Sequence, residues 1–489
     1  MKKAGCLSAI KDLDGVLATD RNTIENIVLS ELAKIFSGRK SRIFSHRNEQ
    51  LIKEAVATSA GGWEEWISDT VDPLKFEDQV CRPVEETEIE SIINGLKRHR
   101  APGVDGVTTM MLKCAGPVLL GQITQLFNAI LEEGIVPEAL AVGKMTLIDK
   151  KASSLNVSDK RPLTVSSVIL SVFTKVLHGR LDPICEAEGF YGEVQYGFRS
   201  GHSTTDCIFM LLAAVCRAKR NGHVISVAFC DIAKAYDSVD RELLYRKLDS
   251  IGFGGRIKSI VQSMYFNDCV RVRIKGGLSA PLWFTKGVKQ GCVLSPLLFA
   301  LYISGLGRIL HSMREGVQFD NCVVSALFFA DDLILISRTR LKGMERMFKA
   351  VQRFCSAMNM KLAVSKTVIL SNGPANTAWS VDENKPGLEA VLVGKYLGID
   401  LQVKGRNLVK AREDKMISIA QSYAHTIMGV TRSGLDKALI VRKLWECCAI
   451  PSFLYGVEAM TITKSTIEKL EMVQSQVARV ILQLPRSAS

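Results

Sequence analysis

Two adjacent aspartates, Asp331 and Asp332, lie within the apolar segment CVVSALFFADDLILIS. Two carboxylates in such surroundings repel each other and lose hydration, which costs several kcal/mol unless a cation balances them. A hard divalent metal such as Mg2+ is the natural partner, because it prefers carboxylate oxygens as ligands. The alternative is a solvated hairpin turn, although the segment lacks the Gly or Asn that such a turn usually contains.

A further candidate carboxylate, Asp231, lies in the segment VISVAFCDIAKAYDSVDRELL. Residues 224–229 have the pattern of a buried strand, so we expect Asp231 at its end, and Asp237 or Asp240 can cap the helix that follows. A strand-end carboxylate can join Asp331 around two metal ions. Two ions about 3.5–4 Å apart can activate an attacking oxygen and stabilise a leaving one in phosphoryl transfer. Taken alone, Asp231 fits a strand-terminal cap better than a metal ligand.

The segment KGVKQGCVLSPLLFALYI predicts a ligand-binding loop followed by a helix. Gly287 and Gly291 allow a ligand to approach the backbone closely, and the Gln290 amide can form hydrogen bonds. Ser295 and Pro296 make a favourable helix start. Many loops contain such residues, so this segment alone does not identify a site.

The hydrophobic pattern predicts the strands that must position these residues. Residues 323–329 and 333–336 predict two strands that meet at a tight turn. Residues 144–148 and 162–165 predict a hairpin around a polar loop, and the basic residues there are Lys150, Lys151, Lys160 and Arg161.

Two other segments have an informative pattern. Residues 84–100 predict a helix with acidic residues at its front and Lys97, Arg98 and Arg100 at its back, as the helix dipole favours, stopped by residues 101–103. The longest uncharged stretch, residues 290–307, is interrupted by Ser, Pro and Gly and is shorter than the roughly 20 apolar residues of a membrane span. We therefore expect it to be buried core.

The composition limits the classes of protein that fit. The chain has 489 residues, of which 47% are hydrophobic and 23% charged, so it can bury a sizeable core in two to four structural units and is not disordered as a whole. The net charge of +13 favours a polyanionic partner, either nucleic acid or an anionic membrane surface. Thirteen cysteines include no CxxC pair, so a disulfide framework or zinc module is not indicated, and a reducing intracellular compartment fits best.

Seven segments resemble, in order and spacing, the reverse transcriptases of non-long-terminal-repeat (LINE-type) retrotransposons. The resemblance is firm over residues 84–400 and weaker to about residue 485. The segments are APGVDG at 101–106, RPLTV at 161–165, QYGFRSGHST at 195–204, DIAKAYD at 231–237, KQGCVLSPLLF at 289–299, FADD at 329–332 and YLGI at 396–399.

The resemblance implies an α+β right-hand polymerase fold. Its parts would be fingers at residues 84–223, a palm with an antiparallel sheet backed by helices at 224–402, and a helical thumb and tail at 403–489. Residues 1–83 would form a helical or linker region. The reverse transcriptase domain proper would cover about residues 131–402.

The resemblance also assigns catalytic roles. Asp231, Asp331 and Asp332 match the metal-binding carboxylates of the palm, and the backbone carbonyl of Ile232 is a further expected ligand. Lys366 matches the lysine that protonates the leaving pyrophosphate.

Nucleotide-binding roles fall on other segments. Arg161, with Lys150 or Lys151, matches the fingers residues that hold the incoming triphosphate, a role that suits guanidinium geometry and ammonium charge. Gln290 and Gly291 match the loop that borders the nucleotide and template.

Tyr236 matches the aromatic steric gate beneath the sugar, where a large ring clashes with a 2′-hydroxyl and selects deoxynucleotides; the alternative is a core aromatic.

The chain departs from the family pattern at Asn359, where Gly is usual and a left-handed turn is still possible, and at Ala363, where Asn is usual. Asp149 replaces Pro and Phe329 replaces Tyr, and neither change removes a metal ligand.

The activity that the resemblance implies is RNA-directed DNA synthesis with two Mg2+ ions, or Mn2+ as an alternative. The partners would be an RNA template, a DNA primer at the target site and deoxynucleoside triphosphates, with no membrane. A nicked chromosomal strand as primer places the work in the nucleus, after a cytoplasmic ribonucleoprotein stage.

Two alternatives stay open. We see no upstream nuclease domain and no downstream Cys/His cluster, so we expect a fragment or degenerate copy of a longer reading frame. The chain could then be a catalytically inactive RNA-binding relic. A group II intron-type maturase is the other alternative, although it would need an intron-binding extension.

Overall fold

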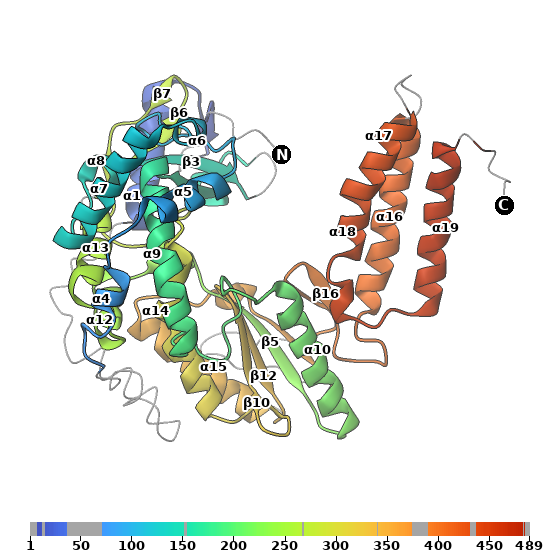
Figure 1. Ribbon diagram of the computed structural model, residues 1–489. Coiled ribbons are helices and arrows are strands. Elements are labelled where there is room, and N and C mark those ends of the chain that lie inside the picture. The colour runs from blue at the N-terminus through green and yellow to red at the C-terminus, as the bar shows by residue number, and fades with distance from the viewer. Residues whose placement is uncertain are drawn as a thin grey trace. The chain divides into compact units, whose positions relative to one another are not determined.

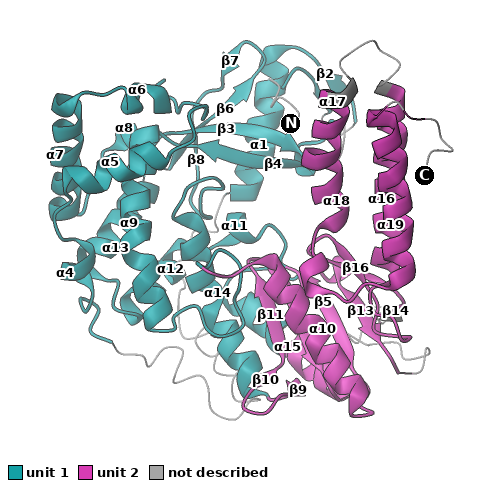
Figure 2. Cartoon of the chain, turned by 45° about the vertical axis from the view of Figure 1, so that its right-hand side comes forward, with its two compact units in different colours: residues 1–200, 232–313, 350–362 teal, residues 201–231, 314–349, 363–489 magenta. Residues whose placement is uncertain are grey.

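Figure 1 shows the computed structural model of the chain, and Figure 2 colours its two compact units. Unit 1 consists of residues 1–200, 232–313 and 350–362, and unit 2 of residues 201–231, 314–349 and 363–489. The structure describes residues 7–11, 15–36, 71–150, 154–266, 268–339, 341–373, 390–430, 437–482 and 484. Both units combine helices with sheets, so the predicted α+β class is confirmed.

Unit 1 contains a sheet in the order β4-β3-β6-β7, with β8 also paired to β6. The strands β3 (Gly143–Asp149) and β4 (Lys160–Val165) form an antiparallel hairpin, which confirms the predicted one. The strand β6 (Cys269–Ile274) runs parallel to β3, and the short β7 (Gly277–Leu278) and β8 (Leu282–Trp283) are antiparallel to β6.

One helix near the N-terminus, α1 (Arg21–Phe36), shares a hydrophobic core with this sheet. Ile24, Val28 and Leu32 recur at the spacing of one helix face and are buried together with Val272 of β6. The short strands β1 (Ile10–Lys11) and β2 (Leu17–Ala18) and the 3-10 turn η1 (Val157–Asp159) complete this region.

The other helices of unit 1 are α4 (Glu77–Val80), α5 (Glu86–Gly95), α6 (Thr109–Lys113), α7 (Pro117–Glu133), α8 (Glu138–Ala141), α9 (Val168–Ala187), α11 (Ala235–Ser238), α12 (Arg241–Ser250), α13 (Gly255–Phe266) and α14 (Ser295–Ser312). Asp240, not Asp237, caps α12, since its side chain accepts hydrogen bonds from two backbone amides of the first turn. The helix α15 (Leu341–Ala357) belongs partly to each unit.

The helix predicted over residues 84–100 is shorter than expected. The helix α5 ends at Gly95, and Leu96 has extended backbone angles of φ −71° and ψ 143°. Glycine is a poor helix former, so the helix stops before Lys97, Arg98 and Arg100 rather than at residues 101–103. These cations therefore do not lie on its last turn.

The predicted buried core at residues 290–307 is confirmed for the helix α14 but not for the loop before it, where Gly291 is exposed and Gln290 and Val293 are only partly buried. Nearly every residue of α14 from Ser295 to Leu310 is buried, and Pro296 lies in its first turn. Among the described residues, no helix is both long and apolar enough to cross a bilayer.

Unit 2 contains a sheet in the order β11-β12-β5-β13-β14. These strands are β11 (Ala326–Phe329), β12 (Asp332–Ser337), β5 (Ser226–Asp231), β13 (Val368–Ser371) and β14 (Ala390–Val391). All neighbours are antiparallel except β13 and β14. The central strand β5 is buried from Ser226 to Cys230, as the apolar run predicts.

The predicted strand at residues 323–329 is divided at Ser325. Its first part, β10 (Val323–Val324), pairs with β9 (Val317–Gln318), and only the second part, β11, joins the main sheet. The helix α10 (Thr204–Arg220), which begins with a capping box at Ser203, lies against β11.

The C-terminal part of unit 2 is helical, as expected for this region. It contains the hairpin of β15 (Gly394–Tyr396) and β16 (Ile399–Leu401), the 3-10 turns η2 (Val364–Lys366) and η4 (Val457–Ala459), the helices α16 (Lys410–Val430), α17 (Lys437–Leu444), α18 (Ile450–Leu454) and α19 (Lys464–Ile481), and a π-helical turn at Trp445–Ala449. A separate hydrophobic core joins these helices.

Candidate active site

Two of the predicted catalytic carboxylates lie opposite each other at one end of the unit 2 sheet. Asp231 ends β5 and Asp332 begins β12, and the antiparallel register pairs them directly. Side chains paired in this way point to the same face, with Cβ atoms about 4.5–5.5 Å apart. Asp331 occupies the tight turn before β12, where Ala330 has a left-handed φ of 58°. The strand ends therefore bring the three aspartates together.

The pKa of the Asp332 carboxyl group is raised to about 6. Desolvation is the largest cause, followed by the charges of Asp331 and Asp231, while Lys366 lowers the pKa. The charges of Asp331 and Asp231 add to the effect of desolvation, because loss of the Asp332 proton places a further negative charge at this end of the sheet. The raised pKa therefore marks an excess of negative charge at this end of the sheet.

Lys366 contacts this carboxylate group directly. Its Nζ lies 2.5 Å from Oδ2 of Asp231, and the backbone N–H of Ala363 donates to the Asp231 carbonyl at 2.8 Å. The unusual Ala363 thus still anchors the turn through its backbone. Asn359 adopts the left-handed conformation anticipated for it, with a φ of 53°.

The carboxylates suit a divalent cation by their chemistry. Hard ions such as Mg2+ prefer carboxylate oxygens, and the excess negative charge at Asp332 favours a cation nearby. In the described residues, no group of three or more His, Cys, Asp or Glu side chains is already arranged to hold a metal ion. Ile232, the expected carbonyl ligand, forms an isolated antiparallel bridge with Leu362.

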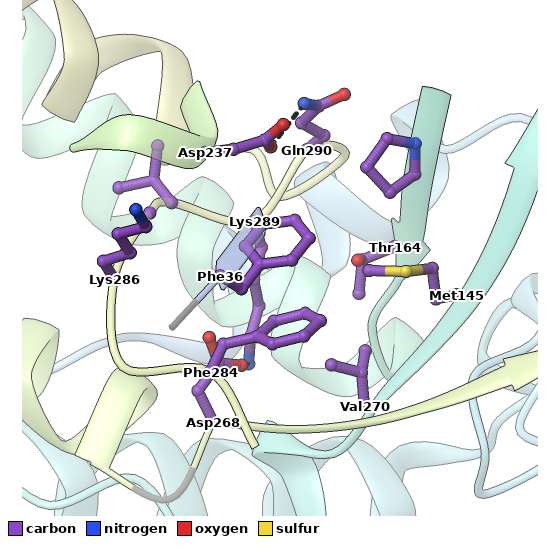
Figure 3. Close-up of a pocket in the computed structure, with 13 residues that line it drawn as sticks. Phe36, Met145, Thr164, Asp237, Asp268, Val270, Phe284, Lys286, Lys289 and Gln290 are labelled. Carbon is purple, nitrogen blue, oxygen red and sulfur yellow. Dashed lines mark hydrogen bonds and ion pairs between the residues drawn. The ribbon is translucent and has the colours of Figure 1, made fainter. Parts of the chain in front are cut away.

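In unit 1, the predicted nucleotide-binding residue Gln290 is held by a buried carboxylate (Figure 3). Its Nε2 donates to Oδ1 of Asp237 at 2.7 Å, and Asp237 is only 5% exposed. Burial raises the pKa of Asp237 to about 6, although Gln290 and the nearby lysines, including Lys150 and Lys286, lower it. The amide of Gln290 is therefore oriented by a group whose protonation changes near pH 6.

The backbone of the same loop docks on the strand β4. The N–H of Thr164 donates to the carbonyl of Gln290 at 2.8 Å. Gly291 has a φ of 113°, and a Cβ atom there would lie 2.4 Å from the carbonyl oxygen of Thr164. Only glycine fits this approach, so the loop and the strand that carries Arg161 lie side by side.

The basic residues of the β3–β4 hairpin have different surroundings. Arg161 and Lys150 are exposed. Lys160 is buried and pairs with Asp149 at 2.6 Å, so the Asp that replaces the usual Pro holds a neighbouring lysine. Lys151 lies outside the described residues.

Tyr236, the predicted sugar gate, lies in the short helix α11. Its ring stacks on Phe299 with centroids 5.0 Å apart and planes 16° apart. Its carbonyl accepts a hydrogen bond from the N–H of Val288 at 2.9 Å, which ties α11 to the Gln290 loop.

Sequence reasoning missed the buried ion network beneath this loop. The Arg241 guanidinium donates to the carbonyls of Gly287 and Phe284, at 2.9 and 2.8 Å, and pairs with Asp268. Lys289 pairs with the same Asp268 at 3.1 Å. These residues are far apart in the sequence, and no local pattern links them. The one available signal was the presence of charged residues in otherwise apolar segments, which indicates buried ion pairs.

Comparisons with known proteins agree with the resemblance seen in the sequence. A family described as "Reverse transcriptase (RNA-dependent DNA polymerase)" matches residues 148–401. The "Probable RNA-directed DNA polymerase from transposon BS" of Drosophila melanogaster is 23% identical over 93% of this chain and 50% of its own length. The "Retrovirus-related Pol polyprotein from type-2 retrotransposable element R2DM" of the same species is 28% identical over 73% of this chain and 34% of its own length.

This chain thus spans about half or less of the length of these relatives. A solved telomerase structure from Candida tropicalis is a more distant match, with 14% identity, a TM-score of 0.40, and coverage of 58% of this chain and 59% of the telomerase chain.

Proposed function

This chain belongs to the reverse transcriptase (RNA-dependent DNA polymerase) family, and we propose that it copies RNA into DNA by nucleotidyl transfer. The observation that carries the proposal is the pair Asp231 and Asp332, held opposite each other by β5 and β12 with Asp331 in the adjoining turn. The family's activity requires acidic groups on separate elements at one place, and a sheet end of this kind supplies them.

We propose that Asp231, Asp331 and Asp332 bind Mg2+, or Mn2+ in its place. Desolvation and the negative charges of Asp331 and Asp231 raise the pKa of Asp332, and the closeness of these charges supports the proposal. When bound, such ions favour ionisation of the attacking hydroxyl and stabilise charge on the leaving oxygen. The carbonyl of Ile232, next to Asp231 in the chain, is the further ligand we propose.

In the proposed reaction, the primer 3′-oxygen forms a bond to the α-phosphorus of a deoxynucleoside triphosphate, and the bond from that phosphorus to the oxygen that bridges to the β-phosphate breaks. Arg161, with Lys150 or Lys151, would hold the triphosphate, and Lys366 would give a proton to the departing pyrophosphate. Gln290 and Gly291 would border the nucleotide, and Tyr236 would exclude a 2′-hydroxyl.

The template and primer are proposed by analogy with the relatives, whose names describe RNA-directed DNA polymerases of transposons. We propose a retrotransposon RNA as template and a nicked target DNA as primer. The basic stretch at residues 401–446, with nine Lys or Arg against four Asp or Glu, would contact the duplex backbone. The nuclear site of action and the limits of fingers, palm and thumb stay predictions.

Primer extension with the purified chain tests the proposal. We expect a DNA primer on an RNA template to be extended with deoxynucleotides in Mg2+, in the order that the template dictates. An inactive relic would bind the RNA without extending the primer. A maturase would, in addition, bind its own intron RNA far more tightly than an unrelated RNA of equal length.

A further inference from the structure

Phe198, in the segment QYGFR, has an unusual backbone conformation for its residue type. Its φ is 62°, in the left-handed region, and the residue is 49% exposed. A bulky residue there is strained, whereas glycine would not be. Such strain persists where the surrounding structure enforces it, and it is concentrated at functional sites.

The segment around Phe198 is fixed from both sides. The Gln195 side chain accepts a hydrogen bond from the N–H of Gly197 at 2.9 Å. Arg199 donates to the carbonyls of Gly192 and Gln195, at 3.1 and 2.8 Å, and forms a two-pronged ion pair with Glu186. These bonds hold the backbone of Phe198 in its strained conformation, which cannot relax without breaking them.

The Phe198 ring contacts Tyr236. The two centroids lie 6.5 Å apart with the planes at 83°, an edge-to-face arrangement, while Phe299 stacks on Tyr236 at 5.0 Å. Tyr236 is thus held by one ring from the helix α14 and by a second ring that a strained loop presents.

We propose that Phe198 is a positioning residue that fixes the Tyr236 ring and so determines how strictly the enzyme rejects ribonucleotides. The inference rests on the proposed function. A ribonucleotide differs from a deoxynucleotide by one hydroxyl, so a gate must hold its ring in one place to reject it. With Phe198 absent, Tyr236 would keep its stack on Phe299 but could tilt about it, which would leave room for the 2′-hydroxyl.

The test compares kcat/KM for a deoxynucleotide and the matching ribonucleotide in wild type, Phe198→Ala, Phe198→Gly, Tyr236→Ala and the double variant Phe198→Ala/Tyr236→Ala. Loss of an aromatic pair should lower the deoxy-to-ribo ratio roughly 2- to 12-fold in Phe198→Ala. Phe198→Gly should lower it equally although it relieves the backbone strain. Phe266→Ala, which removes an 83% exposed ring of unit 1, is the matched control and should keep the wild-type ratio.

Two results would overturn the inference. One is a wild-type ratio in Phe198→Ala when Tyr236→Ala lowers it. The other is a double variant in which the effects of Phe198→Ala and Tyr236→Ala on the ratio are additive. If Phe198 acts through the Tyr236 ring, its replacement should have no further effect once that ring is absent.

A second readout separates the inference from the proposed function. The unfolding free energies of the four proteins in the Phe198/Tyr236 cycle report the coupling between the rings without any activity. Coupling between the two rings supports the contact even if no primer is extended. The absence of primer extension would then reject only the proposed function. An absence of coupling overturns the inference whatever the activity.

Discussion

Lys366 Nζ lies 2.5 Å from Oδ2 of Asp231, the carboxylate paired with Asp332 across β5 and β12. The ammonium compensates part of the negative charge at the end of this sheet, and its charge lowers the pKa of Asp332. Its side chain is 67% exposed, so it can also reach a departing group. In the proposed reaction, this lysine would therefore balance the aspartates before the chemical step and supply a proton during it.

Replacement of Lys366 by Met should slow nucleotide incorporation roughly 10²- to 10⁴-fold, the usual contribution of a general acid. Single-nucleotide incorporation in a rapid-quench instrument would measure the rate. Lys366→Arg keeps the charge but is a much weaker acid, so it should recover little of the rate. Lys361→Met, at an exposed lysine of unit 1, is the control. An unchanged rate in Lys366→Met would reject the assigned role.

Asp237 should make the protein less stable as the pH rises from about 4 to 6. Burial raises the pKa of its carboxyl group from 3.8 to about 6, so the folded state binds more protons than the unfolded state in this window, and stability is lost as the proton leaves. The loss would be on the order of 3 kcal/mol. Asp237→Asn removes a titrating group but keeps an oxygen that can accept from Gln290.

Urea unfolding of Asp237→Asn and wild type at pH 4, 5, 6 and 7 would measure this difference. The gap between the two proteins should grow in favour of Asp237→Asn up to about pH 6 and then stay constant. Asp320→Asn, at a side chain 87% exposed, should show no such trend. A gap that is independent of pH would contradict the raised pKa.

The buried network beneath the Gln290 loop should contribute strongly to stability. Arg241→Met leaves Asp268 with Lys289 alone and frees the carbonyls of the loop, so a loss of about 3–5 kcal/mol in unfolding free energy is expected. Arg442→Met breaks an exposed ion pair with Glu446 and should cost at most about 1 kcal/mol. Similar losses in the two variants would show that the network is not needed for stability.

Gly291→Ala should disturb the docking of the loop on β4. The substitution adds backbone strain of about 1–3 kcal/mol and overlap with the carbonyl of Thr164, which costs about 1–3 kcal/mol more. Gly222→Ala shares a positive φ of 70° but meets open space, so it isolates the strain. We expect Gly291→Ala to be the less stable variant in thermal unfolding and to raise the KM for deoxynucleotides, and equal behaviour of the two would contradict the contact.

The strands that carry the aspartates could be predicted from the sequence because apolar runs of strand length enclose polar residues at fixed points. The pattern thus located Asp231 at the end of β5 and the turn at Asp331. The left-handed Ala330 could not be predicted, since alanine has no preference for that conformation. The pairing of Phe329 with Asp332 across this two-residue turn, not the residue type, sets it.

Contacts between residues that are far apart in the chain could not be predicted from local sequence patterns either. The contact of Gln290 with Asp237 joins residues 53 positions apart, and both Asp237 and Asp240 looked equally suited to cap the next helix. Which of them caps and which is buried depends on the loop that packs above them. The early end of α5 at Gly95 has a local cause, which is the low helix propensity of glycine. The prediction gave more weight to the charge pattern, which continues to Arg100.

Single-nucleotide incorporation opposite an RNA template in Mg2+ tests the central claim most directly, with wild type compared with Asp331→Ala, Asp332→Asn and the exposed control Asp320→Asn. We predict incorporation by wild type and Asp320→Asn and none by the other two, all four having the same circular dichroism and thermal midpoint within a few degrees. No incorporation by well-folded wild type, or equal incorporation by Asp331→Ala, would contradict the assignment of this sheet end as a polymerase active site.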